Sequence, residues 1–538
     1  MTETTHPPAA LRWWTLAVVS IGTFMLMLDL SVISVALPGI HDSLNASFSD
    51  MQWVFDAYAL TLAAFLVTAG SVADRTGRKR LFLIGLVIFT AASLACGLAG
   101  DIGVLNVSRG VQGVGGAIMF AVGPALLGHE FRGKERATAF SAFGAAVGLA
   151  VATGPLIGGA LTNGPGWRWI FYLNVPIGLV TVLIALRNVR ESRLPSAAPP
   201  DFAGMVSFTL SLAALVLAII RGNTDGWYSG TNIALYVVAA VFLAVFVAVA
   251  RKRGEHAMFD TQLFRNRTFL GVSGATFLAN AAGLPPIFLV TTYLQSVEGA
   301  SAWSAGLRFL PLTLAMFFFG AMAGGLIGKV PFKIIVATSQ LALGVGLLLL
   351  HLSHADDSWT SLIPALVVIG FAFGLFNPTR AALAIGVAEP AKAGVASGIS
   401  ETFQQVGTAL GIAVAGAFFE NHVTSAFKGS DAAAKLTDAQ SDQIAHAVSA
   451  GSIDEAAHSA GPGLADQVLN AGREAFTTGF HDAMTLCAVF AFAAAIIAAL
   501  TLRQKDLHES ALTGIPPELP EPGAEPASLD KATPAAQH

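Results

Sequence analysis

The chain has 538 residues, of which 54% are hydrophobic and only 12% are charged, with a formal net charge of −4. Soluble globular proteins carry about 25% charged residues, so this composition excludes a soluble domain and indicates a polytopic α-helical membrane protein. The two cysteines, Cys96 and Cys487, both lie inside apolar runs. Neither a disulfide nor a cysteine metal site is therefore expected.

Apolar runs of about 20 residues, the length that spans a bilayer, recur along the whole chain. We predict fourteen transmembrane helices, at residues 13–38, 53–73, 81–100, 104–127, 138–162, 168–187, 202–220, 231–250, 269–292, 304–327, 333–351, 360–379, 394–420 and 481–502. The first run is long enough to span and is followed by no cleavage site, so no signal peptide is expected. An even number of spans places both termini on one side.

Basic residues indicate which side that is. Most of the 30 Lys and Arg residues fall in alternate loops, at 75–80, 132–136, 187–193, 251–267, 329–333 and 380–392, and near the two ends of the chain. Because loops rich in Lys and Arg remain in the cytoplasm, we expect both termini to be cytoplasmic.

The order of the spans predicts a domain plan. Residues 1–12 form a short cytoplasmic start, 13–187 a first six-helix bundle, 202–250 two inserted helices, and 269–502 a second six-helix bundle. A weak repeat supports the two halves: "GSVADRTGRKRLF" (70–82) and "GGLIGKVPFKII" (324–335) occupy matching places, as in transporters built from parallel repeats. The polar segment 421–480 is expected to be an external loop, and 503–538 a disordered cytoplasmic tail.

Apart from charged residues at the very ends of the spans, such as Asp482, five charged residues fall within the predicted spans: Asp29, Asp56, Arg109, Arg308 and Glu401. Asp56 and Arg308 lie near the external ends of their helices. We therefore expect both side chains to reach water.

Asp29 and Arg109 lie deeper and at similar levels. At about 1.5 Å per residue, Asp29 lies about 24 Å from the inner end of span 1, and Arg109 about 8 Å below the outer end of span 4. A lone charge inside a bilayer costs at least about 2.5–3.5 kcal/mol, so the two side chains are expected to pair or to line a wet cavity. The pair either fixes helix packing or binds a proton at Asp29 and thereby frees Arg109.

Glu401, in "SGISETFQQVG" (397–407), lies about 10 Å above the inner end of span 13. Three interpretations stay open. It is a second proton carrier, a ligand for a cationic substrate, or a carboxylate wetted by the inner vestibule.

Four motifs carry a family resemblance. "GSVADRTGRKR" (70–80) resembles the signature loop between spans 2 and 3 of the major facilitator superfamily, and "LNVSRGVQGVGGA" (105–117) resembles its span-4 motif. "VATGPLIGGAL" (151–161) is similar to the Gly-Pro motif of its exporters, and "LDLSVISVALP" (28–38) to the span-1 motif of its fourteen-span drug:proton antiporters. "GWRWIFYLNVPIG" (166–178) and "LFRNRTF" (263–269) are also similar to that subfamily.

The resemblance implies roles for the signature loop. Gly70 and Gly77 would permit close helix approach and a tight turn, while Arg75 and Arg78 belong to a cluster facing lipid phosphates. Asp74 would bind the positive end of span 13, which begins near Gly394, and so latch the two halves together.

The other motifs imply further roles. Gly154, Pro155, Gly158 and Gly159 form a small-residue face for close helix packing; the exporter meaning of that face comes from the resemblance. Arg109, Gln112 and Gly113 form the span-4 motif, with Asp29 as the expected partner of Arg109.

The sequence departs from the family pattern in three places. The second-half loop "GGLIGKVPFKII" lacks an acidic residue, so any latch is one-sided. Glu401 stands where members of the resembled family tend to carry a neutral polar residue, and the acidic residue Asp56 is also unusual at its position. The number of protons carried is therefore left open.

Together these features predict a proton-coupled exporter of small amphipathic compounds, working as a monomer by alternating access, without a cofactor or a metal and without nucleic acid. The cavity is expected between spans 1, 4, 9 and 12, with five candidate contacts: Gln112, Asn280, Phe288, Asn377 and Gln404. No P-loop pattern is present. A metabolite importer or facilitator, and a membrane-embedded enzyme or lipid-handling protein, are the alternatives.

Overall fold

The computed structural model describes residues 9–131, 133–193, 201–254, 257, 263–327, 329–353, 358–387, 393–461 and 463–506. These residues form helices, with one isolated bridge between Ile327 and Val330. The expected disordered tail from 503 lies largely outside the described part, as do residues 1–8.

Six helices form the N-terminal half: α1 (Ala9–Leu44), α2 (Phe48–Thr76), α3 (Arg78–Leu98), α4 (Ile102–Glu130), α5 (Gly133–Asn163) and α6 (Arg168–Asn188). The inserted pair is α7 (Phe202–Asp225) and α8 (Gly230–Arg253). The C-terminal half contains α9 (Arg267–Ser296), α10 (Ala302–Arg308), α11 (Leu310–Leu326), α12 (Phe332–Leu349), α13 (Ile363–Gly386), α14 (Ala393–Lys428) and α17 (Ala465–Thr501). Two shorter helices, α15 (Asp438–Ser449) and α16 (Ile453–Ser459), lie between α14 and α17, and short 3₁₀ turns stand at 263–265, 350–352, 359–362, 433–435 and 504–506.

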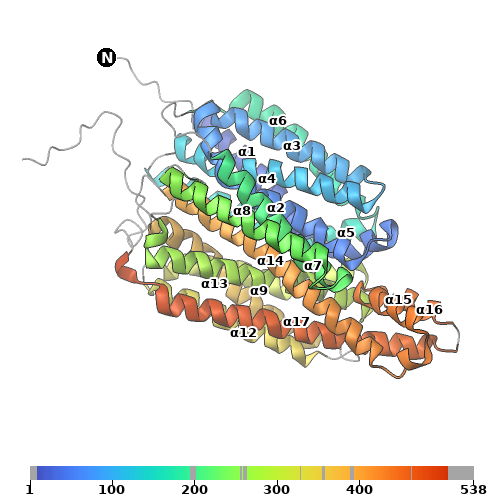
Figure 1. The fold of residues 1–538 in the computed structure, drawn as a ribbon. Helices are drawn as coiled ribbons and strands as arrows, with labels where there is room; N and C mark the ends of the chain where they lie inside the picture. Colours follow the sequence, from blue (N-terminus) through green and yellow to red (C-terminus); the bar gives the residue numbers. More distant parts are fainter. Residues whose placement is uncertain are drawn as a thin grey trace, which may run out of the picture.

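Twelve stretches of the described chain are long and apolar enough to cross a membrane, with α10 and α11 together forming one of them. Helices α2 and α5 are not among the twelve, but α2 packs along α4 and α5 along α1. With them, the all-α plan of two six-helix bundles and an inserted pair is complete (Figure 1).

Small polar residues in the loops set where helices begin. Ser47 forms a capping box with Asp50 at the start of α2, and the side chains of Asp101 and Asn266 cap α4 and α9. The predicted span at 304–327 is divided at Phe309, because Pro311 stands in the first turn of α11 and cannot donate a backbone hydrogen bond.

The predicted loop 421–480 is shorter in the structure than the sequence suggests. Helix α14 continues to Lys428 and α17 begins at Ala465, because neither 421–428 nor 465–480 contains a proline that would end a helix. What remains between them is largely α15 and α16, which pack against α14 and α17.

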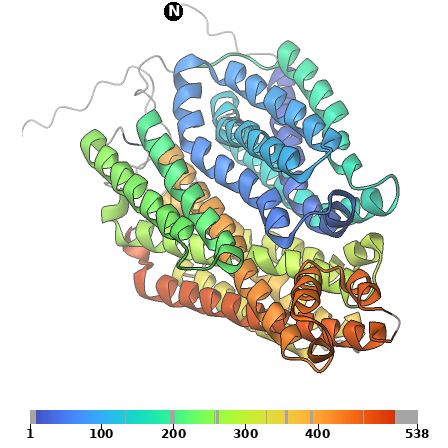
Figure 2. The ribbon, with the colours of Figure 1, turned by 45° about the vertical axis from the view of Figure 1, so that its right-hand side comes forward.

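Each half is a bundle, and the inserted pair α7 and α8 forms a layer beside the two bundles. In the N-terminal half α1 packs on α5, and α4 on α2 and α3; in the C-terminal half α9 packs on α14 and α17, and α13 on α11 and α12. Helices α7 and α8 pair with each other, and α7 also touches α2 and α14, one helix from each half. Figure 2 shows this pair beside the main body.

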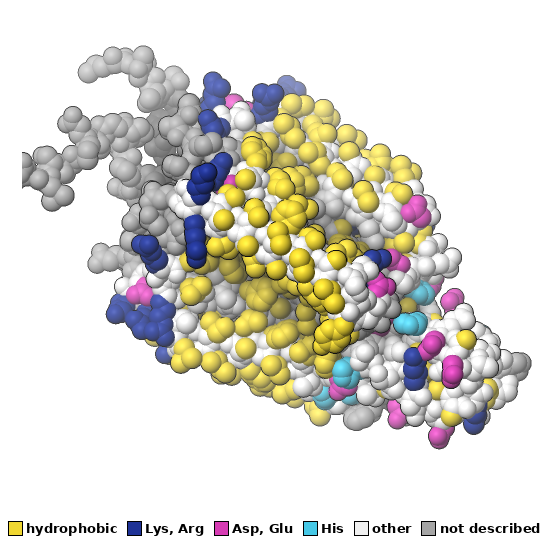
Figure 3. Space-filling view, in the orientation of Figure 1, with side chains coloured by type: hydrophobic (Ala, Val, Ile, Leu, Met, Phe, Trp, Pro, Cys, Tyr) yellow, Lys and Arg dark blue, Asp and Glu magenta, His cyan; other side chains and the backbone are white. Residues whose placement is uncertain are grey.

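The two ends of the bundle differ in charge. In Figure 3, Lys and Arg side chains gather at one end, a hydrophobic belt follows, and acidic and histidine side chains gather at the end that α15 and α16 cover. We name the first the basic end, which holds residues 75–80, 187–193 and 251–253, and the second the capped end.

The halves meet toward the capped end. Gln52 Nε2 of α2 donates to the Ile412 carbonyl at 3.0 Å, and Gln295 Nε2 of α9 donates to the Val35 carbonyl at 3.3 Å. His41 Nδ1 lies 3.0 Å from the Ser452 hydroxyl. The structure therefore shows the bundle closed at its capped end.

Candidate functional site

Asp29 of α1 and Arg109 of α4 form a buried ion pair. Arg109 Nη1 donates to Asp29 Oδ2, and neither side chain is exposed to solvent. The two residues thus lie at one level, as their predicted depths suggest. Pairing offsets a desolvation cost of several kcal/mol per ion, but removal of either partner would leave an uncompensated buried charge.

Two amides complete the coordination of Asp29. Gln112 Nε2 donates to Asp29 Oδ1 at 3.0 Å, while Gln112 Oε1 accepts from Arg109 Nη1 at 2.8 Å. Asn174 Nδ2 of α6 donates to the same Oδ1 at 3.2 Å and to the Ser93 hydroxyl of α3 at 3.0 Å. Gln112 is fully buried, and in this state both of its polar atoms serve the ion pair; its place in a cargo cavity stays a prediction.

Asn174 and Ser93 are absent from the site that the sequence predicts. Asn174 stands in the stretch "FYLNVPIG", which the family resemblance marks without assigning a role. A buried amide in an apolar helix needs a polar partner, and that is the signal that points to it.

The guanidinium of Arg109 also holds α2. Its Nε donates to the Val54 carbonyl at 3.0 Å, and its Cζ lies 4.4 Å from the centroid of the Tyr58 ring. Its Nη2 is buried and has no hydrogen-bond partner among the described residues. One side chain therefore ties α1, α2 and α4 together through its charge, and a change of charge at Asp29 would disturb all three.

Asp56 contradicts the expectation of an interfacial residue. Its exposure is 0%, and neither carboxyl oxygen has a hydrogen-bond partner in the described part of the chain. The reason is that α2 begins at Phe48, two turns before Asp56, and packs there against α14 of the other half. Nearness to a helix end therefore does not expose this side chain.

Arg308 and Glu401 each have a partner in their own half. Arg308 Nη1 donates to Glu298 Oε2 at 2.7 Å at the capped end, where burial raises the pKa of Glu298 and Arg308 opposes that rise. Arg380 Nη2 donates to Glu401 Oε1 at 2.9 Å. The sequence places Arg380 in a loop, but α13 extends to Gly386, and Arg380 is 5% exposed.

The signature loop is held by a residue that sequence analysis missed. Gly77 has φ +119° between α2 and α3, where a Cβ would lie 2.7 Å from the carboxylate of Glu191. That carboxylate accepts from the backbone N–H groups of Lys79 at 3.0 Å and Arg80 at 3.1 Å. Glu191 thus caps the start of α3, where the helix dipole favours a negative charge.

The other predicted residues of the signature loop are Gly70, Asp74, Arg75 and Arg78. A Cβ on Gly70 would meet nothing within 4 Å, so Gly70 marks no close helix approach in this structure. Arg75 is exposed and Arg78 donates its backbone N–H to the Ser192 carbonyl at 2.9 Å, both at the basic end. The side chain of Asp74 and the side chains at the start of α14 lie outside the described residues, so the latch remains a prediction.

The Gly-Pro motif of α5 faces two helices. A Cβ on Gly154 would meet the Ser31 side chain, and one on Gly158 would lie 2.8 Å from the Val32 carbonyl of α1. On the adjacent face, a Cβ on Gly159 would lie 2.5 Å from the Ala302 carbonyl, and a Cβ on Gly306 would lie 2.3 Å from the Pro155 carbonyl. The motif therefore brings α5 into backbone contact with α1 in its own half and with α10 in the other.

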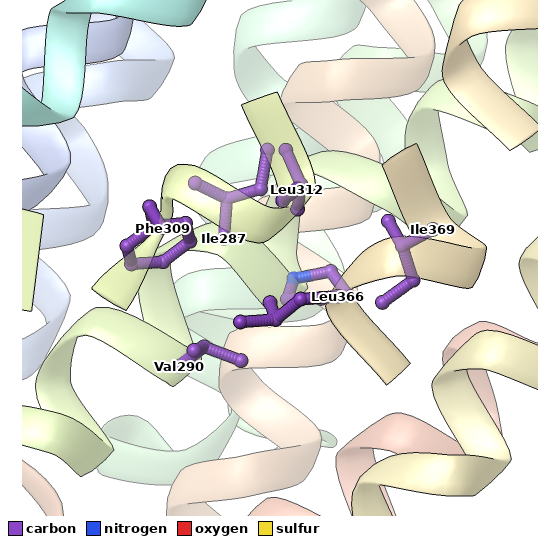
Figure 4. Close-up of a pocket in the computed structure, with 7 residues that line it drawn as sticks. Ile287, Val290, Phe309, Leu312, Leu366 and Ile369 are labelled. Carbon is purple, nitrogen blue, oxygen red and sulfur yellow. The ribbon is translucent and has the colours of Figure 1, made fainter. Parts of the chain in front are cut away.

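The remaining predicted cavity residues have different surroundings in this state. Asn280 is buried and donates to the Thr276 carbonyl at 2.8 Å, and Phe288 packs against Phe48 and Phe55 across the halves. Asn377 and Gln404 are half-buried. Figure 4 shows a separate apolar pocket between α9, α11 and α13, lined by residues including Ile287 and Leu366, whose volume of about 10 Å³ is too small for an organic cargo.

The sequence profile of the Major Facilitator Superfamily matches residues 19–412. The chain belongs to the Major Facilitator Superfamily. Members of this superfamily are membrane transporters and not enzymes, and the alternative of a membrane-embedded enzyme is therefore wrong.

Two relatives within the superfamily illustrate the match. Multidrug resistance protein Stp of Mycobacterium tuberculosis is 35% identical over 66% of this chain and 65% of its own length. The tetracenomycin C resistance and export protein of Streptomyces glaucescens is 30% identical over 96% of this chain and 97% of its own. The chain thus spans just under two thirds of the first relative and nearly all of the second.

A solved structure supports the same fold. A bacterial homologue of the human lysosomal transporter Spinster superposes with a TM-score of 0.61 at 18% identity, covering 93% of this chain and 99% of the other. At that identity the likeness concerns the fold alone.

Proposed function

We propose that the protein is a proton-driven exporter of small amphipathic organic compounds. Three observations support this: membership of the superfamily, relatives whose names describe multidrug resistance and antibiotic export, and the fully buried Asp29–Arg109 pair. The single observation that carries the coupling is the ion pair, because a charge pair inside a membrane bundle is costly and marks a proton or ion pathway.

The proposed topology follows the charge asymmetry. The basic end is cytoplasmic, in keeping with the positive-inside rule, and the capped end is outside the cell (Figure 3). Helix α1 starts and α17 ends at the basic end, so both termini are cytoplasmic in a multi-pass protein of the plasma membrane. The structure then represents the state that is closed to the outside.

The proposed coupling step takes place at Asp29. A proton that binds Asp29 neutralises the carboxylate, and Arg109 loses its counter-charge. We assign this proton binding to the state that is open to the outside. Because Arg109 also binds the Val54 carbonyl and Gln112, α1, α2 and α4 must then repack, which favours closure of the capped end. Release of the proton to the inside restores the ion pair. Proton entry from outside and cargo exit alternate through this one residue. Glu401 forms an ion pair with Arg380 in this state, so we assign Glu401 a secondary part in coupling.

The proposed cargo path lies between α1, α4, α9 and α13. Asn280, Phe288, Asn377 and Gln404 are proposed contacts that become accessible as the halves separate. An amphipathic cargo fits such a mixed lining, because apolar rings supply contact area and a few amides fix orientation.

The test uses purified protein in liposomes with an imposed pH gradient and a panel of fluorescent amphipathic dyes. Wild type should move dye uphill and take up protons as dye leaves, and Asp29→Asn should lose both while remaining folded. Asp225→Asn, at an exposed site on α7, is the matched control and should transport normally. Uphill movement by Asp29→Asn, or dye movement by wild type without proton uptake, would refute the proposal; downhill movement alone would identify a facilitator.

A further inference from the structure

Asp56 is a buried carboxylate for which the proposed cycle gives no role. It is fully buried in α2, and both of its oxygens lack hydrogen-bond partners within the described residues. Most buried polar side chains in proteins have at least one partner. This exception therefore requires an explanation.

Asp56 lies on the line where the two halves meet. One turn toward the capped end, Gln52 donates across that line to the Ile412 carbonyl of α14 at 3.0 Å. One turn in the other direction, Ala59 and Leu60 pack in one cluster with Ala409 and Ala413 of α14 and with Leu212 of α7. Asp56 is thus enclosed between two contacts that join the halves, and both must break when the capped end opens.

The charged side chains on the surrounding helices are engaged elsewhere. Asp50, on α2 itself, caps its own helix. On the neighbouring helices α1, α4, α7, α9 and α14 they include Asp29 with Arg109, Arg221 with Asp225, Arg267 with the Leu500 carbonyl, Glu401 with Arg380, and Glu420 with His446. Toward the ends of α1 and α14, Arg12 pairs with Glu135, His41 with Asp42, His422 with Asp482 and Lys428 with Asp442. Asp56 has no ion pair with any of them in the described structure.

An isolated carboxylate without water or a counter-ion is far too costly to remain ionised, and such a group takes up a proton instead. When the two halves separate at the capped end, water reaches Asp56 on the line where they meet, and the ionised form of its carboxylate becomes stable. We propose that Asp56 is a second proton-binding site, occupied while the capped end is closed and emptied toward the outside when it opens.

This inference rests on the proposed topology and adds an element to the proposed cycle. Acid on the outer side favours the closed capped end, because closing requires one proton at Asp56. A single linked proton changes the ratio of open to closed molecules by up to tenfold per pH unit.

The experiment measures opening directly, without cargo or gradient. Spin labels are placed on Gly100→Cys, where a Cβ meets open space, and on Asp431→Cys, which is exposed in the C-terminal half at the capped end. Cys96 and Cys487 are both buried. Label distances in nanodiscs between pH 5 and pH 9 report the ratio of open to closed molecules.

We expect the wild-type ratio to fall with acid by up to tenfold per pH unit. Asp56→Asn mimics the protonated acid, so its capped end should stay closed from pH 5 to pH 9 and its ratio of open to closed molecules should not change with pH through position 56. The apolar Asp56→Leu should behave in the same way. Asp50→Asn, two turns earlier in α2, should keep the wild-type profile.

Two results would overturn the inference. One is a pH profile of Asp56→Asn equal to that of wild type. The other is loss by Asp56→Asn of binding of a permanently cationic dye, but not of a neutral one, which would make Asp56 an ionised cargo ligand. Either result leaves the liposome test of Asp29 untouched, and failure of wild type to export uphill leaves the distance measurement interpretable.

Discussion

Gly159 of α5 lies against the backbone of Ala302 at the start of α10, so closely that a Cβ on Gly159 would stand 2.5 Å from the Ala302 carbonyl oxygen. The two residues belong to different halves and meet toward the capped end. The obstacle is backbone and not a flexible side chain, so any side chain at position 159 must push the halves apart.

The first prediction concerns this contact. Gly159→Leu should prevent closure of the capped end and lower uphill export at least tenfold, because the state that loads cargo from inside becomes inaccessible. Gly144→Ala on the same helix is the matched control, since its Cβ would meet nothing within 4 Å. Export assays and label distances on both variants check this; closure by Gly159→Leu would contradict it.

The second prediction concerns Arg109→Lys. Lysine keeps the charge but lacks the planar fork that reaches Asp29, Gln112 and the Val54 carbonyl together. Hydrogen bonds to charged groups contribute about 1.5–3 kcal/mol each, so export should fall at least tenfold with protein still in the membrane. Arg221→Lys, in a surface ion pair with Asp225, should export like wild type. Normal export by Arg109→Lys would show that charge alone suffices.

The third prediction concerns the turn at Gly77. Gly77→Ala should destabilise the protein by about 1–3 kcal/mol, because φ +119° is strained for any residue with a side chain and because Glu191 occupies the space. Glu191→Ala should restore only part of that loss, since it relieves the clash but leaves the strain. Thermal unfolding in detergent, with Gly70→Ala as the control in open space, measures the difference. Equal stability of Gly77→Ala and Gly70→Ala would refute the account of this turn.

The fourth prediction concerns pH and His446 of α15. Hydrogen bonding to Glu420, at 3.5 Å, raises the pKa of His446 above its usual value, against the burial that lowers it. A folded-state pKa above the unfolded one gives stability that is complete below about pH 6.5 and is lost as pH rises through the folded-state value.

Wild type should therefore lose its Tm advantage over His446→Gln as the pH rises from 6 to 9. His458→Gln, at an exposed position in α16, should follow the wild-type curve. A constant difference in Tm between wild type and His446→Gln at all pH values would rule out this linkage.

Much of the fold and the centre of the site could be predicted from the sequence. Charge-free runs of fixed length indicate the helices, and simple depth arithmetic places Asp29 and Arg109 at one level. The pairing then follows from the cost of a lone charge in lipid.

The predictions that the structure contradicts concern residues whose burial or partners depend on which helices pack together. Asp56 lies near a helix end, where exposure is the natural expectation, but the contact of α2 with α14 buries it, and no local pattern encodes that contact. Glu191 stands in a charged loop segment that reads as solvated. The sequence places Arg380 in a loop, because helix ends are the least certain part of any such prediction.

Under the proposed export cycle, the position of α7 has a consequence for how cargo arrives. It packs on α2 and α14, one helix from each half, whereas the opposite flank, where α5 meets α10, has no inserted helix over it among the described residues. A lipophilic molecule dissolved in the inner leaflet would therefore find one flank covered and the other bare. Recruitment from the lipid is then directional around the circumference of the protein.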